Sequence, residues 1–359
     1  MRNAVGWTRI VRAGRPLAGL ALLGLALLAA APGAERRWSF TTHTMGTYAT
    51  VTLFGADSLE AARRAWLAGL DLMRVDSLMS NWTKTSEVAR INRLADSTRV
   101  VLHPEVARVI AAALRAGRDS RGAFDITVEP LVRAWGFLGG PKRVPDSTEV
   151  AAARERMGLR YVQFDSTAGT LRLTHRGTRL DLGGIAKGYA AATAARTLAS
   201  QGVRVALVDI SGNMAALGAP PGRAGWIIGV RDPRGRLDDL ARLTLKDEAI
   251  STSGKYEQFV NKDGHLYGHI LDPRTGWPAE GLISVTVVAP DAMTADAWST
   301  ALFAMGPAEA RGMARARADV GALFVTPGVD RDTLWVEENL RTRCVIEEKS
   351  APFLVVKFY

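Results

Sequence analysis

The sequence predicts an α+β fold in which mixed or antiparallel sheets pack against helices. Strand-like and helix-like segments alternate irregularly along the 359 residues, and several neighbouring strands are close enough in sequence to form hairpins. A doubly wound parallel sheet would instead show a regular alternation of strand and helix. The chain carries no internal repeat and no long linker, so we expect one folded domain over residues 35–359.

The first part of this domain is predicted to change from strands to helices. Residues 38–54 alternate in polarity and are rich in Thr, Tyr and Val, which favour strands. Apolar residues recur at helical spacing over residues 58–78 and 104–118. Ser86 is expected to cap a short helix between these two. Residues 122–140 are expected to form a loop, a helix and a second loop.

The second part is predicted to return mainly to strands. Residues 162–181 are expected to form a hairpin, and the Ala-rich residues 183–200 a helix that follows a glycine turn. Another helix is expected at residues 294–305, and residues 321–359 should alternate strands and turns. Further strands are predicted at residues 205–210, 226–230, 243–245, 249–252 and 283–289.

The N-terminal segment is typical of a signal peptide. Residues 1–34 contain four arginines and no acidic residue, and residues 17–31 are an uninterrupted run of small and apolar residues. This run is short for a membrane span of about 20 residues, although an uncleaved N-terminal anchor stays an alternative. The segment has no cysteine that could carry a lipid. We therefore expect an exported protein, either periplasmic or attached to the outer face of the inner membrane.

Charge and cysteine content exclude some classes of protein. The net charge is +10, of which residues 1–34 contribute four. The remaining basic and acidic residues are interspersed, and no basic run is long enough to predict binding to nucleic acid. Cys344 is the single cysteine, so an internal disulfide is excluded and stability must come from the hydrophobic core.

A glycine turn between Asp181 and Lys187 is the first candidate site. Gly183 and Gly184 end a predicted strand and begin a predicted helix, and free N–H groups at a helix start attract anions. Lys187 adds a positive charge, so a phosphate or pyrophosphate would suit this turn. The spacing matches neither the Walker pattern nor the dinucleotide fingerprint. A plain turn with a solvated lysine is the alternative.

Asp296 and Thr300 form a second candidate site. They lie four residues apart in a predicted helix and therefore share a face. A carboxylate and a hydroxyl are oxygen ligands that suit Mg²⁺ or Ca²⁺ rather than zinc, and a backbone carbonyl of a glycine turn could supply a third oxygen. The alternative is an acid in the first helical turn that interacts with the helix dipole, beside an incidental threonine.

His269 is the third candidate. It follows a strand-like run and precedes a turn with Asp272 and Arg274. On a continuous strand it would share a face with His265, but roughly 13 Å would separate the two, which is too far for one zinc ion. His269 is thus either a hydrogen-bonded structural histidine or a general base for a hydroxyl nucleophile.

Aromatic and polar loops complete the candidates. Phe124 and Asp125 lie in one predicted loop and Trp82 in another, where exposed rings could stack on a flat heterocycle. Buried aromatic side chains are the commoner arrangement. Ser253 follows a predicted strand and could offer a hydroxyl. The sequence has no Gly-x-Ser-x-Gly motif and no cysteine-based catalytic site.

Taken together, these blocks resemble the ApbE family, the FAD:protein FMN transferases. The resemblance covers roughly residues 40–306 and depends on the ordered combination rather than on any one block. The matching residues are 45–47, 86–87 with Asn92, 122–125, 130–131 with 135–137, 181–189, 253–254 with Tyr256, 269–276 with Pro278, and 295–297 with Thr300.

The resemblance implies a single ApbE-type α+β domain and an exported enzyme with FAD as its substrate. It implies that Mg²⁺ assists cleavage of the pyrophosphate, that FMN moves to a threonine or serine of an acceptor protein, and that AMP leaves. Membrane redox subunits are the family's usual acceptors. Asp296, Thr300 and the carbonyl of Gly184 would hold Mg²⁺, and His269 would activate the acceptor hydroxyl. The residues that would contact FAD are Met45, Trp82, Ala123, Phe124, Asp125, Asp181, Lys187 and Ile270.

The chain departs from the family pattern at four places. Ala192 and Lys255 stand where the family often has an acidic residue and Asp or Asn, respectively. Residues 211–213 replace a Gly-Gly-Asp-type turn, and Trp82 stands where Tyr is common. Two other functions stay open: a Mg²⁺-dependent FAD pyrophosphatase that gives FMN and AMP, and a flavin-binding protein without turnover.

Overall fold

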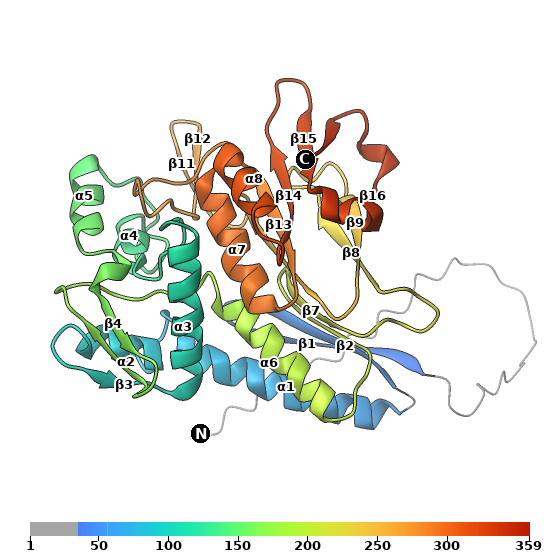
Figure 1. Ribbon diagram of the computed structural model, residues 1–359, viewed down its shortest axis with the longest axis horizontal. Helices are drawn as coiled ribbons and strands as arrows, with labels where there is room; N and C mark the ends of the chain where they lie inside the picture. Colours follow the sequence, from blue (N-terminus) through green and yellow to red (C-terminus); the bar gives the residue numbers. More distant parts are fainter. Residues whose placement is uncertain (1–34, 56) are drawn as a thin grey trace, which may run out of the picture.

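The computed structural model describes residues 35–55 and 57–359, so the predicted signal peptide or anchor at residues 1–34 lies outside it. Helices and strands are mixed, and the predicted α+β class is confirmed (Figure 1). The centre is a nine-stranded sheet in which all neighbours are antiparallel except the last pair. In spatial order its strands are β1 (Arg36–Thr44), β2 (Thr47–Gly55), β6 (Ala206–Ile210), β7 (Asn213–Leu217), β10 (Ala249–Gly254), β13 (Ser284–Ala289), β14 (Gly321–Thr326), β15 (Asp332–Val336) and β17 (Leu354–Phe358).

The two faces of this sheet bury different partners because successive side chains of a strand point to opposite faces. On β14, Ala322 and Phe324 join the core beneath the helices, whereas Leu323 and Val325 join a second core. That second core is closed by a three-stranded sheet with antiparallel neighbours. Its strands are β8 (Trp226–Arg231), β9 (Asp239–Leu245) and β16 (Cys344–Ile346), with the 3₁₀ helices η2 (Glu338–Arg343) and η3 (Glu348–Ser350) beside β16 in sequence.

Three helices cover the first face: α1 (Ser58–Met79), α6 (Ala186–Ser200) and α7 (Ala292–Met305). α6 is rich in alanine, so its axis can lie close to both neighbours. α7 packs on β10 and β13 beside α6, which packs on β6 and β7, and nearly all of the α7 side chains are buried. α3 (Pro104–Asp119) and α8 (Pro307–Arg315) also contact α7. This burial fixes the position of every side chain that α7 carries.

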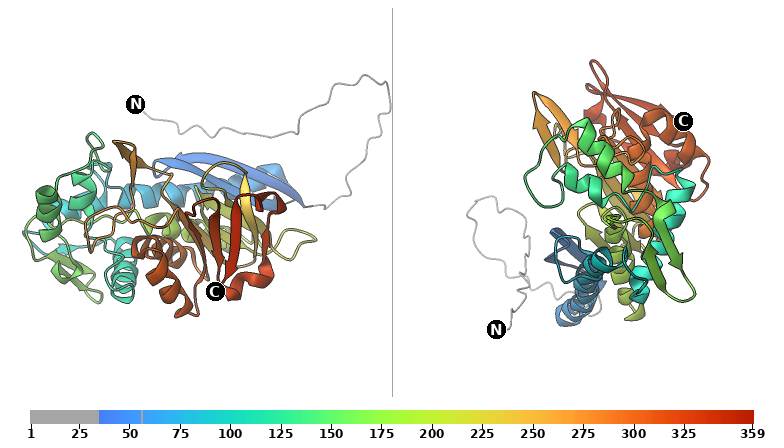
Figure 2. Two further views of the ribbon diagram at one scale, coloured as in Figure 1. Left: turned by 90° about the horizontal axis from the view of Figure 1, so that it is seen from above. Right: turned by 90° about the vertical axis from the view of Figure 1, so that its left-hand side faces the viewer.

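The remaining elements gather at the end of the molecule opposite β8, β9 and β16 (Figures 1 and 2). A third small core there contains Leu131, Trp135 and Phe137. The two-stranded hairpin β11–β12 contributes Val260 and Tyr267 to it. The elements are α2 (Glu87–Leu94), α4 (Glu129–Ala134), α5 (Ser147–Glu155), η1 (Leu159–Tyr161), β3 (Val100–Val101), β4 (Val162–Asp165), β5 (Thr170–Leu173), β11 (Phe259–Lys262) and β12 (His265–Gly268).

The structure confirms most predicted elements and corrects several boundaries. The hairpin expected over residues 162–181 ends at Leu173, because the chain turns where the Thr178 N–H donates to the His175 carbonyl. The helix expected from residue 183 begins at Ala186, because the Asp181 carboxylate accepts the Gly183 N–H at 2.7 Å and holds a turn there. α5 and α8 were not predicted. Within residues 35–55 and 57–359, no helix is long and apolar enough to cross a membrane.

Candidate functional site

The site is organised by the close crossing of α6 and α7. A Cβ on Gly188 would lie 2.0 Å from the Ala292 carbonyl oxygen, so this crossing requires glycine. The Gly188 N–H donates to Asp296 Oδ2 at 2.8 Å. Ile185 stands at the N-cap position of α6 and makes no side-chain cap bond. The carboxylate of α7 therefore takes the anion position that the sequence predicted at this helix start.

Asp296 is almost fully buried, and this burial raises the pKa of its carboxyl to about 6. The positive charge of Lys187 and the N–H groups of Gly188 and Lys187 act in the opposite direction. The Asn213 amide is oriented with its NH₂ group toward Asp296 and its oxygen toward Lys187. In this orientation it donates to Asp296 Oδ1 at 2.9 Å and accepts from Lys187 Nζ at 3.2 Å. Asp296, Lys187 and Asn213 thus form one connected polar group.

Thr300 and Gly184 lie next to this group. A Cβ on Gly184 would lie 3.3 Å from Thr300 Oγ1 and 3.1 Å from the ring of Phe124, so the glycine backbone lies directly against the threonine. In the part of the chain that the structure describes, the Thr300 hydroxyl has no hydrogen-bond partner. The Thr300 hydroxyl and the Asp296 carboxylate lie one turn apart on α7 and are oxygen donors, which fit a hard divalent cation.

The bounds of α7 test the alternative in which Asp296 lies in the first turn and interacts with the dipole of its own helix. α7 begins at Ala292, and its N-cap is Asp291, whose side chain accepts the Thr294 N–H at 2.9 Å. Asp296 therefore lies in the second turn and does not stabilise the start of its own helix. Among the described residues, no group of three His, Cys, Asp or Glu side chains could hold a metal. A cation at Asp296 would have to complete its coordination with neutral oxygens, water or a ligand's phosphates.

His269 lies immediately after β12 rather than on it. β12 ends at Gly268, which pairs with Phe259 at the start of β11. The His269 N–H donates to the Gln258 carbonyl at 3.0 Å, and its Nδ1 lies 3.2 Å from the same oxygen. When Nδ1 carries its proton on that bond, Nε2 presents a free lone pair. His265 has a different partner, Glu280, at 3.3 Å.

The environment of His269 favours the neutral ring. Burial lowers the pKa of His269 to about 4, and the charges of Lys187 and Lys142 lower it further despite the bond to Gln258. Phe137 packs against the ring at 6.3 Å in an edge-on geometry. Because Lys187 acts on the pKa values of both His269 and Asp296, this lysine links the histidine to the oxygen donors.

The predicted FAD residues fall into three groups. Asp125 and Asp181 lie on adjacent segments, since the Asp181 N–H donates to the Ile126 carbonyl at 2.7 Å. Burial raises the pKa of both carboxyls. Ala123, Phe124 and Ile270 are buried packing residues.

Met45 and Trp82 lie outside these packed segments. Met45 lies in the β1–β2 turn with a φ of +52°, held by a bond from its N–H to the Asp76 carboxylate at 2.9 Å. Trp82 is 69% exposed. Within the described residues, neither Met45 nor Trp82 forms a hydrogen bond with Asp296 or His269.

Comparison with known proteins gives the family. The ApbE family profile matches residues 45–324. The chain belongs to the ApbE family. A relative from Klebsiella pneumoniae named FAD:protein FMN transferase is 33% identical over 313 residues, which cover 85% of this chain and 89% of that protein. An Escherichia coli relative of the same name is 30% identical, with 85% and 88% coverage.

Solved structures agree with this membership. The ApbE protein of Thermotoga maritima aligns with a TM-score of 0.79 at 33% identity and covers 86% of this chain and 99% of its own. The flavin transferase ApbE of Vibrio cholerae aligns with a TM-score of 0.76 at 29% identity and covers 87% and 100%. The predicted family is therefore confirmed by sequence and by fold.

Sequence reasoning named Ser253 as a possible hydroxyl group but missed the network in this ApbE site to which it belongs. Ser251, Ser253 and Ser299 form a chain of hydroxyls with O–O distances of 2.9 Å, and the Ser299 hydroxyl donates to the Asp296 carbonyl at 3.0 Å. Asn213 connects to the same chain through Ser251 at 2.7 Å. The available signal was the polar residue Asn213 at the start of β7 and the alternating serines Ser251 and Ser253 on β10, which contact Asp296 or Ser299 of α7. Their convergence needs the sheet order and cannot be read from spacing.

Proposed function

We propose that this ApbE-family chain is an FAD:protein FMN transferase that requires Mg²⁺. It transfers FMN from FAD to a threonine or serine hydroxyl of an acceptor protein and releases AMP. The observation that supports the proposal is the bond from the start of α6 to the buried Asp296 carboxylate beside Lys187, with Gly184 packed against Thr300 one turn further along α7. Phosphoryl transfer needs charge neutralisation and positioning more than covalent chemistry.

The oxygen donors and the lysine supply the neutralisation. Asp296, Thr300 and the carbonyl of Gly184 would hold Mg²⁺, which when bound offsets the negative charge of the pyrophosphate. Lys187 adds a mobile positive charge beside them. Its contact with Asn213 at 3.2 Å keeps the ammonium close to Asp296, so a pyrophosphate held by Mg²⁺ at Asp296 would also meet the positive charge of Lys187.

His269 supplies the proton acceptor. Nε2 of the neutral ring takes the proton of the acceptor hydroxyl, and the hydroxyl oxygen forms a bond to the phosphorus on the FMN side. The bond from that phosphorus to the bridging oxygen breaks, and AMP leaves with the electron pair. The carbonyl of Gln258 holds the ring in the required orientation through Nδ1.

Flavin binding is assigned to the remaining predicted residues. The exposed ring of Trp82 suits stacking on a flat heterocycle. The carboxyls of Asp125 and Asp181 can accept N–H groups of a base or flavin, and Met45 presents a partly buried side chain from a fixed turn. The buried residues Ala123, Phe124 and Ile270 would form the apolar wall of the flavin site.

One experiment separates the three candidate functions. The purified full chain is incubated with FAD, MgCl₂ and threonine-containing peptides, and AMP, free FMN and peptide-bound FMN are measured by mass spectrometry. Peptide-bound FMN with equal AMP supports the transferase. Free FMN and AMP without labelled peptide would identify a pyrophosphatase, and intact FAD would identify a binding protein.

Export and the nature of the acceptor belong to the same proposal. Residues 1–34 would direct the chain to the periplasm or to the outer face of the inner membrane, and the acceptor would be a membrane redox subunit. Fractionation of cells that express the full chain tests the first part. Recovery in the cytoplasmic fraction alone would contradict it. Mass spectrometry of co-expressed membrane subunits for added FMN tests the second.

A further inference from the structure

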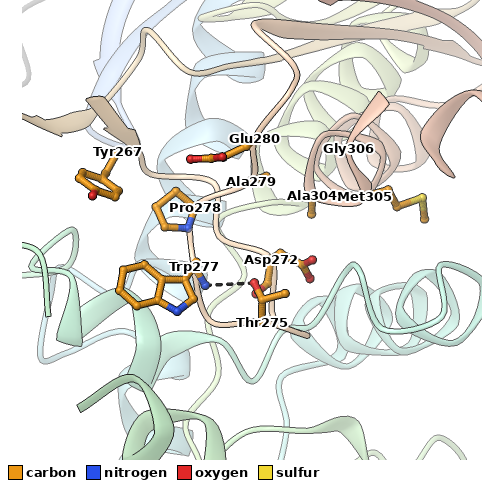
Figure 3. A pocket seen from close by; sticks show the side chains of 10 residues that line it. All are labelled: Tyr267, Asp272, Thr275, Trp277, Pro278, Ala279, Glu280, Ala304, Met305 and Gly306. Atoms are coloured by element: carbon orange, nitrogen blue, oxygen red, sulfur yellow. Dashed lines mark hydrogen bonds between the residues drawn. The ribbon is translucent and has the colours of Figure 1, made fainter. Parts of the chain in front are cut away.

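A pocket of about 440 Å³ lies between the segment that follows β12 and the C-terminal end of α7. Figure 3 shows Tyr267, Trp277 and Pro278 on one side and Ala304 and Met305 on the other. None of the residues assigned above to FAD, Mg²⁺ or proton transfer lines it. The full lining is Tyr267, Asp272, Thr275, Trp277, Pro278, Ala279, Glu280, Ala304, Met305 and Gly306.

Two elements lead from the pocket to the candidate site. Ala304 follows Thr300 by four residues on α7, so it lies on the same helix face about 6 Å further along the axis. Tyr267 precedes His269 by two residues, which is about 7 Å of extended chain. A polypeptide in this pocket would therefore lie one helical turn beyond the metal donors and next to the histidine.

The chemistry of the pocket favours a peptide over a small anion. Its walls are apolar at Pro278, Ala279 and Met305, and the ring of Trp277 is 37% exposed while one edge packs on Trp135 at 5.4 Å. An exposed aromatic anchor beside apolar walls is typical of the centre of a protein interface.

The residues that line the pocket include two carboxylates, and one cation outside the lining, Arg154, donates to the Arg274 carbonyl. Arg274 neutralises Asp272 through two bonds of 2.9 and 3.1 Å. No lining residue is lysine or arginine. The Glu280 side chain is 67% exposed, and among residues 35–55 and 57–359 its one ionic partner is the imidazole of His265 at 3.3 Å. Lys255 lies against Gly268, which by strand alternation belongs to the hairpin face opposite Tyr267.

We propose that this pocket docks the acceptor polypeptide, as an extended segment with an apolar residue against Trp277 and a basic residue against Glu280. The proposal rests on the transferase function. The segment places its threonine or serine hydroxyl beside His269 Nε2, while its flanking side chains occupy the pocket. Affinity for the acceptor thus comes from residues that do not touch FAD.

The test uses a displayed peptide library with a fixed central threonine and three random residues on each side. The purified full chain, FAD and MgCl₂ are added, and peptides that gain FMN fluorescence are sorted and sequenced. Wild type should favour peptides with lysine or arginine over glutamate or aspartate by about two- to fivefold, the strength of an exposed ion pair. Glu280→Lys should reverse this preference.

Two further variants define the control and the anchor. Glu348→Lys makes the same charge change on an exposed residue of η3, far from the pocket, and should keep the wild-type preference. Trp277→Ala should raise the KM for a selected peptide about fivefold or more, while AMP release without peptide stays unchanged.

The outcomes are distinct. If the labelled peptides show no preference for basic residues, the docking proposal is wrong and the transferase function stands. The same conclusion follows if Glu280→Lys keeps the preference of wild type. Release of AMP and FMN with no peptide labelled overturns the transferase and the docking surface together.

Discussion

Replacing Gly188 with alanine tests whether the α6–α7 crossing builds the metal site. The new Cβ would lie 2.0 Å from the Ala292 carbonyl oxygen and 2.7 Å from the Asp296 Cβ, whereas ordinary contact begins near 3.4 Å. Backbone atoms cannot turn away as a flexible side chain can. The helices would therefore have to separate by about 1.4 Å at this point.

Separation has an energetic and a functional cost. Overpacking a core costs about 1–3 kcal/mol, and weakening the bond from the Gly188 N–H to the buried Asp296 carboxylate costs about 1–3 kcal/mol. Since the two effects overlap, we expect Gly188→Ala to lower the free energy of unfolding by about 2–4 kcal/mol. A displacement of this size at Asp296 should also lower Mg²⁺-dependent turnover about 100-fold.

Gly312→Ala is the matched control. Gly312 is a helical glycine of α8 with no atom within 4 Å of its added Cβ, so alanine there should stabilise the protein by about 0.5–1 kcal/mol. Urea unfolding gives both free energies, and AMP release per folded molecule gives turnover. Similar urea midpoints for the two variants would refute the crowding argument, and normal turnover in folded Gly188→Ala would refute the link to Asp296.

Four further outcomes follow from the site and the fold. Asp296→Asn can still accept the Gly188 N–H, but its NH₂ group would face the Asn213 NH₂ group that donates to the carboxylate, so the protein should fold with a loss of about 1–3 kcal/mol. Because the charge is also lost, AMP release at any MgCl₂ concentration should fall about 100-fold or more. His269→Ala should lose transfer by about 10²–10⁴-fold, with FAD affinity, measured by fluorescence quenching, within error of wild type. Because the Asp296 carboxyl has a pKa of about 6 and His269 one of about 4, kcat/KM for transfer at limiting MgCl₂ should fall below about pH 6; at saturating MgCl₂, which keeps Asp296 ionised, it should stay level from about pH 8 to about pH 5, and an acid limb near 6.5 under that condition would contradict the buried environment of His269. Asp332→Ala removes the carboxylate that Arg234 and Arg236 share and should cost about 1–3 kcal/mol in urea unfolding, with turnover unchanged.

Sequence periodicity predicted the helices that are specified by local sequence patterns. The helices around residues 58–78 and 104–118 have strong apolar repeats, and Ser86 caps its helix as expected, accepting the Ala89 N–H at 2.9 Å. α5 and α8 are short and bury few apolar side chains, so periodicity was too weak to predict them. Their boundary signals were present: a capping box of Asp146 and Glu149 in α5 and Pro307 at the start of α8.

The site was predictable as residue types but not as an arrangement. Helical spacing put Asp296 and Thr300 on one face, yet the bond from α6 to Asp296 depends on two helices separated by about 100 residues of chain. The neutral state of His269 depends on burial and on two distant lysines. Neither property belongs to a local stretch of sequence.

The burial of α7 has a consequence for how local stability is distributed. Its amides should be among the last to exchange with deuterium, because they open only when the cores around them open. The β11–β12 hairpin pairs only with itself and exposes Phe259 and Leu266, so its amides should exchange early. The oxygen donors of α7 would then lie on a rigid helix that loses little conformational entropy when a ligand binds. The strand before His269 could adjust its conformation to different acceptor polypeptides.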